Sequence, residues 1–115
     1  MDLTNEDLIN TGGYDHPFIL NKNNDISIEL YSQKSGVKLE IETTEPVVIL
    51  YTSNGIDEGM SLSNGEKTFK HQGVCLETQW YPDALNQKFL PKNILSPDEK
   101  YYSKTKYSFS KDRFE

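Results

Sequence analysis

Two neighbouring segments of the chain alternate apolar and polar residues, which is the pattern of a β-strand with one buried face. In residues 26–31 every second residue is apolar, and residues 37–42 repeat the pattern. The polar residues between the two segments end in Gly36, so together they predict an antiparallel hairpin with its apolar face inward. The glutamates of this pattern are expected on the solvated face: Glu29, Glu40 and Glu42.

Further strands are predicted at residues 18–20, 47–51, 74–80 and 100–110. The run at 47–51 is continuously apolar, which is typical of a strand covered on both faces. A turn is predicted at 21–25, a surface loop at 55–72 and irregular structure at 81–99, where three prolines interrupt the chain. With no long helical pattern, the sequence predicts an all-β fold of the sandwich type.

The size and charge of the chain limit its class. Its 115 residues are enough for one domain, so a single β-sandwich-like domain is expected over residues 1–115. A formal net charge of −6 argues against nucleic-acid and anionic-membrane partners, because like charges repel. No apolar run approaches the roughly 20 residues of a membrane span. The first ten residues are polar and do not form a signal-peptide pattern, so a cytoplasmic protein is expected.

One acidic residue, Glu77, lies inside the predicted strand at 74–80. Glutamate suits strands poorly, so tertiary context is expected to explain it. A carboxylate on a rigid strand just before a proline-containing loop is well placed for a general base at the rim of a cleft. From spacing alone, a solvent-facing glutamate on an edge strand is the alternative. The single cysteine, Cys75, is expected to be buried and reduced.

Four short motifs occur along the chain in a fixed order. They are GYDHPF at 13–18, YTSN at 51–54, CLETQ at 75–79 with PDA at 82–84, and YSKTKYSF at 102–109. In order and spacing they resemble the C-terminal portion of the aldose 1-epimerase (galactose mutarotase) family, over nearly the whole chain. The resemblance implies an all-β fold, an antiparallel β-sandwich that is the C-terminal part of a galactose-mutarotase-like supersandwich.

The resemblance also implies a chemistry. Members of this family interconvert the α and β anomers of free aldohexoses such as galactose or glucose. A base takes the proton of the C1 hydroxyl while an acid protonates the ring oxygen. Glu77 matches the family's general base, and Asp15 matches an aspartate that accepts hydrogen bonds from sugar hydroxyls. No metal or organic cofactor is implied.

Some positions depart from the family pattern. The family's acid is a histidine, assisted by a second histidine and an arginine in the N-terminal part, and no residue of this chain matches them. His16 is next to Asp15, but on an extended segment the two point to opposite sides, so His16 is expected to have a packing role. His71 has no motif support, and the two histidines make no zinc-binding set. Ile49 stands where some family members carry a sugar-contacting glutamine, and Ser53 stands in place of the more usual glycine.

A chain that supplies the base but not the acid is expected to be one portion of an epimerase. It would be a truncated or split product, or the product of an incomplete gene. A piece of a larger sandwich leaves strand edges and apolar faces uncovered, which predicts self-association or pairing with an N-terminal portion.

Two other functions stay open at this stage. One is a carbohydrate-binding sandwich without catalysis, in which Trp80, Tyr81 and Tyr14 stack on sugar faces, although such aromatic residues more often belong to a core. The other is a role in assembly alone, because a sandwich fold dictates no function. Whether phosphorylated hexoses are substrates is not decided by the sequence.

Overall fold

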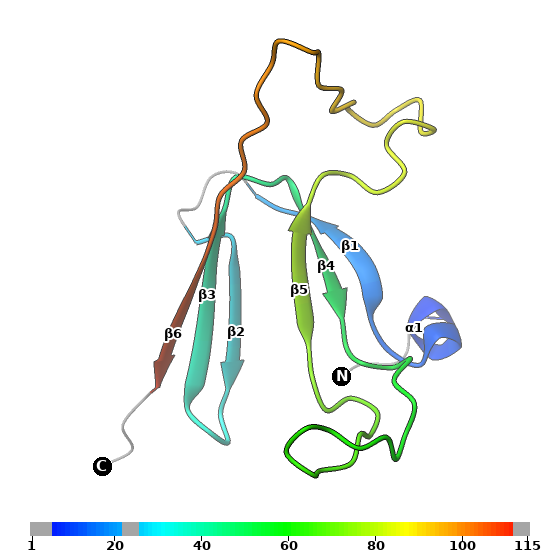
Figure 1. The fold of residues 1–115 in the computed structure, drawn as a ribbon, viewed down its shortest axis with the longest axis vertical. Helices are drawn as coiled ribbons and strands as arrows, with labels where there is room; N and C mark the ends of the chain where they lie inside the picture. Colours follow the sequence, from blue (N-terminus) through cyan, green and yellow to red (C-terminus); the bar gives the residue numbers. More distant parts are fainter. Residues whose placement is uncertain (1–5, 22–25, 112–115) are drawn as a thin grey trace. The chain divides into compact units, whose positions relative to one another are not determined.

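The computed structural model describes residues 6–21 and 26–111. Its elements are α1 (Glu6–Thr11), β1 (Asp15–Ile19), β2 (Ile28–Ser32), β3 (Val37–Thr43), β4 (Val47–Tyr51), β5 (Cys75–Gln79) and β6 (Thr105–Lys111). The strands form two three-stranded sheets, with the orders β1-β4-β5 and β2-β3-β6 (Figure 1). The predicted all-β class is therefore confirmed. Within the described ranges, no helix combines the length and apolar character of a membrane span.

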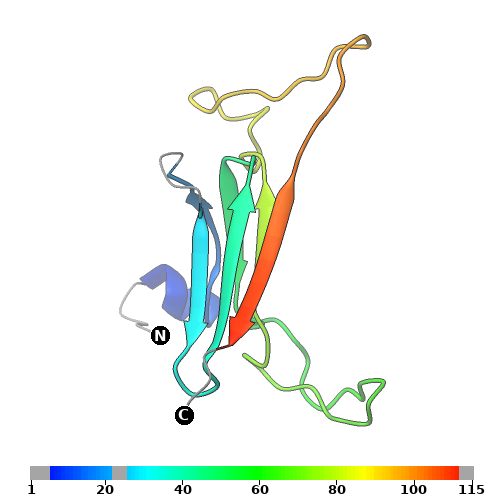
Figure 2. The same cartoon turned by 90° about the vertical axis from the view of Figure 1, so that its left-hand side faces the viewer.

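The predicted hairpin is present with the expected alternation. Strands β2 and β3 pair antiparallel, with Ile28 opposite Ile41 and Leu30 opposite Leu39. Strand β6 pairs antiparallel with the other edge of β3, and Figure 2 shows the three strands side by side. Ile41 is completely buried, whereas Leu30 and Val37 are 40% and 39% exposed. The apolar face of this sheet is thus covered at the Ile41 end and open toward the hairpin loop.

The opposite face of this sheet carries ion pairs. The ammonium group of Lys38 lies 2.9 Å from the carboxylate of Glu29 and 2.8 Å from that of Glu40. Hydrogen bonds to Glu40 and then Glu29 raise the pKa of Lys38 above its ordinary value. Glu42 pairs in the same way with Lys106, at 2.8 Å. The three glutamates therefore lie on the polar face as predicted, where exposed pairs of this kind add little stability.

The chain divides into two compact units, Met1–Phe18 with Ile49–Glu77, and Ile19–Val48 with Thr78–Glu115. In the first unit the buried apolar residue among those described is Leu8 of α1. In the second unit they are Ile41, Val47, Val48 and Ala84. Val47 and Val48 are consecutive and both buried, which confirms that this end of β4 is covered on both faces. The expectation of one domain over 1–115 stays a prediction.

Strand β1 begins earlier than the sequence predicted. The strand was expected at 18–20, but it starts at Asp15 and includes Pro17. Two backbone hydrogen bonds explain its extent: Thr52 N–H donates to the Tyr14 carbonyl at 3.1 Å, and Leu20 N–H donates to the Pro46 carbonyl at 2.9 Å. Their positions show that β1 and β4 are antiparallel neighbours. A proline is tolerated because β1 is an edge strand.

Three other expectations concern Cys75, the final strand and the turn at 21–25. The prediction that Cys75 is buried is wrong, because its side chain is exposed. Cys75 is the first residue of β5, an edge strand that follows an exposed loop, so its side chain is left uncovered. The final strand was predicted over 100–110 and begins only at Thr105. The turn predicted at 21–25 lies, except for Asn21, outside the described residues.

Truncation of Ile41 should destabilise the protein strongly. We expect Ile41→Ala to lower the free energy of unfolding by about 2–4 kcal/mol, because a fully buried side chain leaves a cavity. The matched control is Val37→Ala on the same strand, where 39% exposure predicts a loss below about 1 kcal/mol. Urea denaturation followed by fluorescence measures both. Equal losses for the two variants would contradict this account of the core.

Candidate functional site

The two carboxylates singled out in the sequence lie on the same sheet. Asp15 is the first residue of β1, and Glu77 is the middle residue of β5. These are the two outer strands, on either side of β4 (Figure 1). Outer strands of a three-stranded sheet are roughly 10 Å apart in the hydrogen-bonding direction. Both side chains are exposed, and both residues belong to the first compact unit.

The pairing of β1 with β4 fixes the face on which Asp15 lies. Because Tyr14 is bonded to Thr52, the next pair along the antiparallel ladder is Asp15 opposite Tyr51. Directly opposed residues point to the same side, as does every second residue along a strand. Ile49 therefore shares this face with Asp15.

His16 lies on the other face of β1. Its ring meets the ring of Tyr14 edge-on, with 6.0 Å between centroids, and Tyr14 in turn lies 6.0 Å from Phe18. The His16 Nδ1 accepts the backbone N–H of Asp15 at 2.9 Å, which places the proton of the neutral ring on Nε2. His16 therefore belongs to an aromatic row with Tyr14 and Phe18, in agreement with the packing role expected for it.

The YTSN motif anchors the segment that leads into β1. The Thr52 hydroxyl accepts the backbone N–H of Tyr14 at 2.9 Å, and the Asn54 amide donates to the Thr11 carbonyl at 2.8 Å. Gly13 lies so close that a Cβ there would stand 2.7 Å from the Thr52 hydroxyl oxygen. The first and second motifs are therefore one contiguous structure, and only glycine fits where they touch.

Ser53 adopts a left-handed backbone conformation, with φ of 55°. Glycine adopts such a conformation most readily, so a serine here carries a conformational cost. The Ser53 side chain is 3% exposed, and its hydroxyl donates to the Gly73 carbonyl at 2.7 Å. That hydrogen bond offsets part of the conformational cost. It also ties the turn after β4 to the segment that leads into β5.

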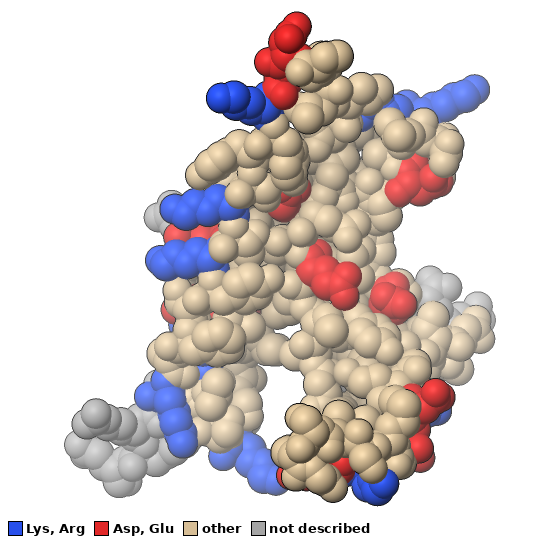
Figure 3. Space-filling view, in the orientation of Figure 1, with Lys and Arg blue, Asp and Glu red and all other residues tan. Residues whose placement is uncertain are grey.

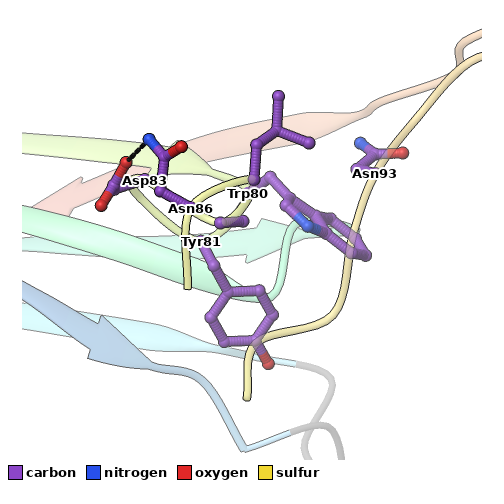
Figure 4. A pocket seen from close by; sticks show the side chains of 7 residues that line it. Trp80, Tyr81, Asp83, Asn86 and Asn93 are labelled. Atoms are coloured by element: carbon purple, nitrogen blue, oxygen red, sulfur yellow. Dashed lines mark hydrogen bonds between the residues drawn. The ribbon is translucent and has the colours of Figure 1, made fainter. Parts of the chain in front are cut away.

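A pocket of about 330 Å³ lies in the loop that follows β5, within the second unit (Figure 4). It is lined by Trp80, Tyr81, Asp83, Ala84, Leu85, Asn86 and Asn93. The Trp80 and Tyr81 rings meet edge-on, 5.7 Å between centroids, and the Trp80 indole N–H donates to the Pro91 carbonyl at 3.2 Å. Sequence reasoning had selected these two aromatic residues as sugar-stacking candidates, and it had singled out Asp83 as part of the PDA motif.

The polar side of this pocket is organised around Asp83. Its carboxylate accepts hydrogen bonds from the side-chain amides of Asn86 and Gln87, which lower its pKa below the ordinary value (Figure 4 shows the first of them). Asp83 has a left-handed φ of 53°, as expected of an aspartate that closes a tight turn. The PDA motif with Asn86 three residues after Asp83 was the available sequence signal. For the residues that the structure describes, no cluster of three or more His, Cys, Asp or Glu side chains could hold a metal ion.

The close approach at Gly13 yields a stability prediction. Gly13→Ala should cost about 1–3 kcal/mol of unfolding free energy, because the new methyl group would overlap the Thr52 hydroxyl. Gly73→Ala is the matched control, since its nearest neighbour would be the Ser53 hydroxyl at 3.4 Å, and it should cost less than about 1 kcal/mol. Thermal and urea unfolding give the comparison. A Gly13→Ala variant as stable as the Gly73→Ala variant would show that this contact relaxes freely.

Comparison with known proteins adds an independent finding. The family model described as aldose 1-epimerase matches residues 1–108. The galactose mutarotase of Rattus norvegicus is 41% identical over 100 residues, which cover 85% of this chain and 29% of the relative. The galactose mutarotase of Homo sapiens matches with the same identity and coverage. The aldose 1-epimerase of Escherichia coli is 31% identical over 113 residues, which cover 93% of this chain and 32% of the relative. The chain therefore spans about a third of the length of these relatives.

Proposed function

The chain belongs to the aldose 1-epimerase family, and from this we propose that it forms part of an active site that interconverts the α and β anomers of free aldohexoses such as galactose or glucose. The observation that carries the proposal is the position of Asp15 and Glu77. They come from two motifs far apart in the sequence, and they lie on the two outer strands of one sheet.

In this proposal Glu77 is the general base. Its carboxylate takes the proton of the C1 hydroxyl while an acid protonates the ring oxygen, so that the C1–O5 bond opens to the aldehyde. Rotation about the C1–C2 bond and reversal of both proton transfers close the ring as the other anomer. Asp15, a carboxylate with acceptors only, binds sugar hydroxyls and fixes the pyranose relative to Glu77. The acid would come from a histidine in the family's N-terminal portion.

Polarimetry of freshly dissolved α-D-galactose tests these roles. The chain is mixed with the part of the rat relative that lies outside the aligned segment, and its rate is compared with that of the chain alone. We expect the mixture to accelerate mutarotation and Glu77→Gln to reduce that acceleration roughly 10²–10⁴-fold, the usual contribution of a positioned base. Asp15→Asn should chiefly raise KM.

The matched control for this experiment is Glu58→Gln, another exposed glutamate of the first unit, and it should leave the rate unchanged. Full activity of the Glu77→Gln mixture would remove Glu77 from the mechanism. A rate unchanged by any mixture would count against the catalytic proposal as a whole.

A second candidate function rests on the pocket beside Trp80. Its edge-to-face aromatic pair and its amide side chains suit the apolar face and the hydroxyls of a sugar. A carbohydrate-binding role without turnover is therefore the alternative. Titration calorimetry with galactose distinguishes it from the first, since binding without faster anomer exchange would favour the pocket. A cytoplasmic location stays a prediction.

The second unit exposes much apolar surface that a partner would cover. Its exposed side chains include Phe89 at 81%, Tyr102 at 75% and Phe109 at 72%. Figure 3 shows uncharged surface between separate basic and acidic groups, with several of the basic groups along its left edge. Phe109 lies on β6, at the edge of its sheet, where a further strand can add. We propose that the family's N-terminal portion covers this surface, or a second copy of the chain in its absence.

Size-exclusion chromatography with light scattering tests the expected association. The chain alone should give a mass above 13.2 kDa that rises with concentration. Phe109→Lys should shift this equilibrium toward the monomer at least ten-fold, because it puts a charge on an apolar edge. Lys111→Ala on the same strand is the control and should not. A monomer at millimolar concentration would overturn the proposal of self-association.

A further inference from the structure

We infer that His71 is a positioning residue that holds the Asp15 carboxylate in place through Thr52. The inference rests on the proposed function in so far as Asp15 binds the sugar hydroxyls. It concerns a loop residue that no motif marks and that lies outside both strands of the candidate site.

His71 adopts an unusual backbone conformation. Its φ is 61°, in the left-handed region that non-glycine residues seldom adopt and that costs roughly 1 kcal/mol or more. In this conformation the ring Nδ1 lies 2.8 Å from the carbonyl oxygen of Thr52. The backbone N–H of His71 also donates to the carbonyl of Ser53, at 3.3 Å. Since a carbonyl only accepts, Nδ1 carries the proton in this bond.

These two bonds clamp the turn that follows β4. The ring fixes the carbonyl of the peptide between Thr52 and Ser53, and that peptide leads directly into the left-handed backbone of Ser53. Freed from the ring, this peptide could rotate toward the more common conformations of a non-glycine residue. His71 thus opposes the relaxation that the unusual Ser53 conformation would otherwise favour.

Thr52 is hydrogen-bonded to Tyr14, the residue before Asp15. The N–H of Thr52 donates to the carbonyl of Tyr14 at 3.1 Å, and the N–H of Tyr14 donates to the hydroxyl of Thr52 at 2.9 Å. Both backbone polar groups of Tyr14, the N–H and the carbonyl, are therefore hydrogen-bonded to Thr52. Because Asp15 is the next residue, the direction of its side chain follows from that bonded pair. A shift of Thr52 would move Asp15.

The same turn is also hydrogen-bonded to the segment that precedes β5, the strand of Glu77. The Ser53 hydroxyl donates to the carbonyl of Gly73 at 2.7 Å, and Gly73 stands two residues before β5 begins. The turn at Thr52 and Ser53 is thus bonded to the approaches of both outer strands. All of these contacts lie within the first compact unit. A single turn, stabilised by His71, sets the position of the strands that carry the base and the binding carboxylate.

Native-state hydrogen exchange of the 115-residue chain tests the clamp without any sugar. The variant His71→Gly removes the ring and keeps a residue that accepts the left-handed backbone. We expect the amides of Tyr14 and Thr52 to exchange roughly ten-fold faster, the effect of losing about one hydrogen bond. The amide of Ile41, in the second unit, should be unaffected. His71→Asn, which tolerates the same φ and offers an amide donor, should restore part of the protection.

The control is Lys70→Ala, an exposed neighbour in the same loop, which should change none of these rates. The functional measurement is mutarotation by the chain with the rat portion described above. His71→Gly should raise KM for galactose roughly five-fold while kcat stays within about two-fold, because the change acts on binding through Asp15. A general loss of stability would instead accelerate exchange at Ile41 as well.

The outcomes separate the inference from the proposed function. Unchanged exchange at Tyr14 and Thr52 in His71→Gly would overturn the inference whatever the sugar data show. Faster exchange with an unchanged KM would overturn the link from His71 to sugar binding. If exchange is faster in His71→Gly but the unsubstituted chain mixed with the rat portion neither binds nor converts galactose, the clamp is supported. The proposed function is then overturned.

Discussion

The candidate site depends on hydrogen bonding along β4. This strand is an apolar run whose first residues, Val47 and Val48, are 1% and 4% exposed, and it occupies the centre of its sheet. A central strand must satisfy its backbone groups on both edges, so it fixes a neighbour on each side. Those neighbours carry Asp15 and Glu77. The carboxylates can remain exposed and polar because the strand between them supplies the buried apolar residues.

Local patterns were sufficient where a segment folds onto its sequence neighbour. The alternation at 26–31 and 37–42 predicted the hairpin and the side of each residue, since a turn of four residues leaves little choice of register. The order β1-β4-β5 could not be read in this way, because it joins segments separated by many residues. The early start of β1 and the exposure of Cys75 depend on that order. A strand's length and coverage are set by its partners as well as by its own residues.

The same distinction applies to the candidate site. Asp15 and Glu77 could be selected because they stand in motifs with a family resemblance, and the separation of Asp15 from His16 followed from the period of a strand. The clamp around Ser53 could not, because left-handed backbone is expected at glycine and here occurs at Ser53 and His71. What identifies those positions is a hydrogen bond between loops, which only the folded chain contains.

The exposure of the two carboxylates bears on how such a site would work. A hydrogen bond from a sugar hydroxyl to Asp15 strengthens as water is excluded, because the local dielectric constant falls. In its proposed role, the attraction between the Glu77 carboxylate and the proton of the C1 hydroxyl would strengthen for the same reason. The described residues give both groups a rigid sheet and an unusual, clamped turn, but they leave both side chains exposed. Under the proposed roles, orientation would be the contribution of this chain, and exclusion of water would require surface from the sugar and from a covering partner.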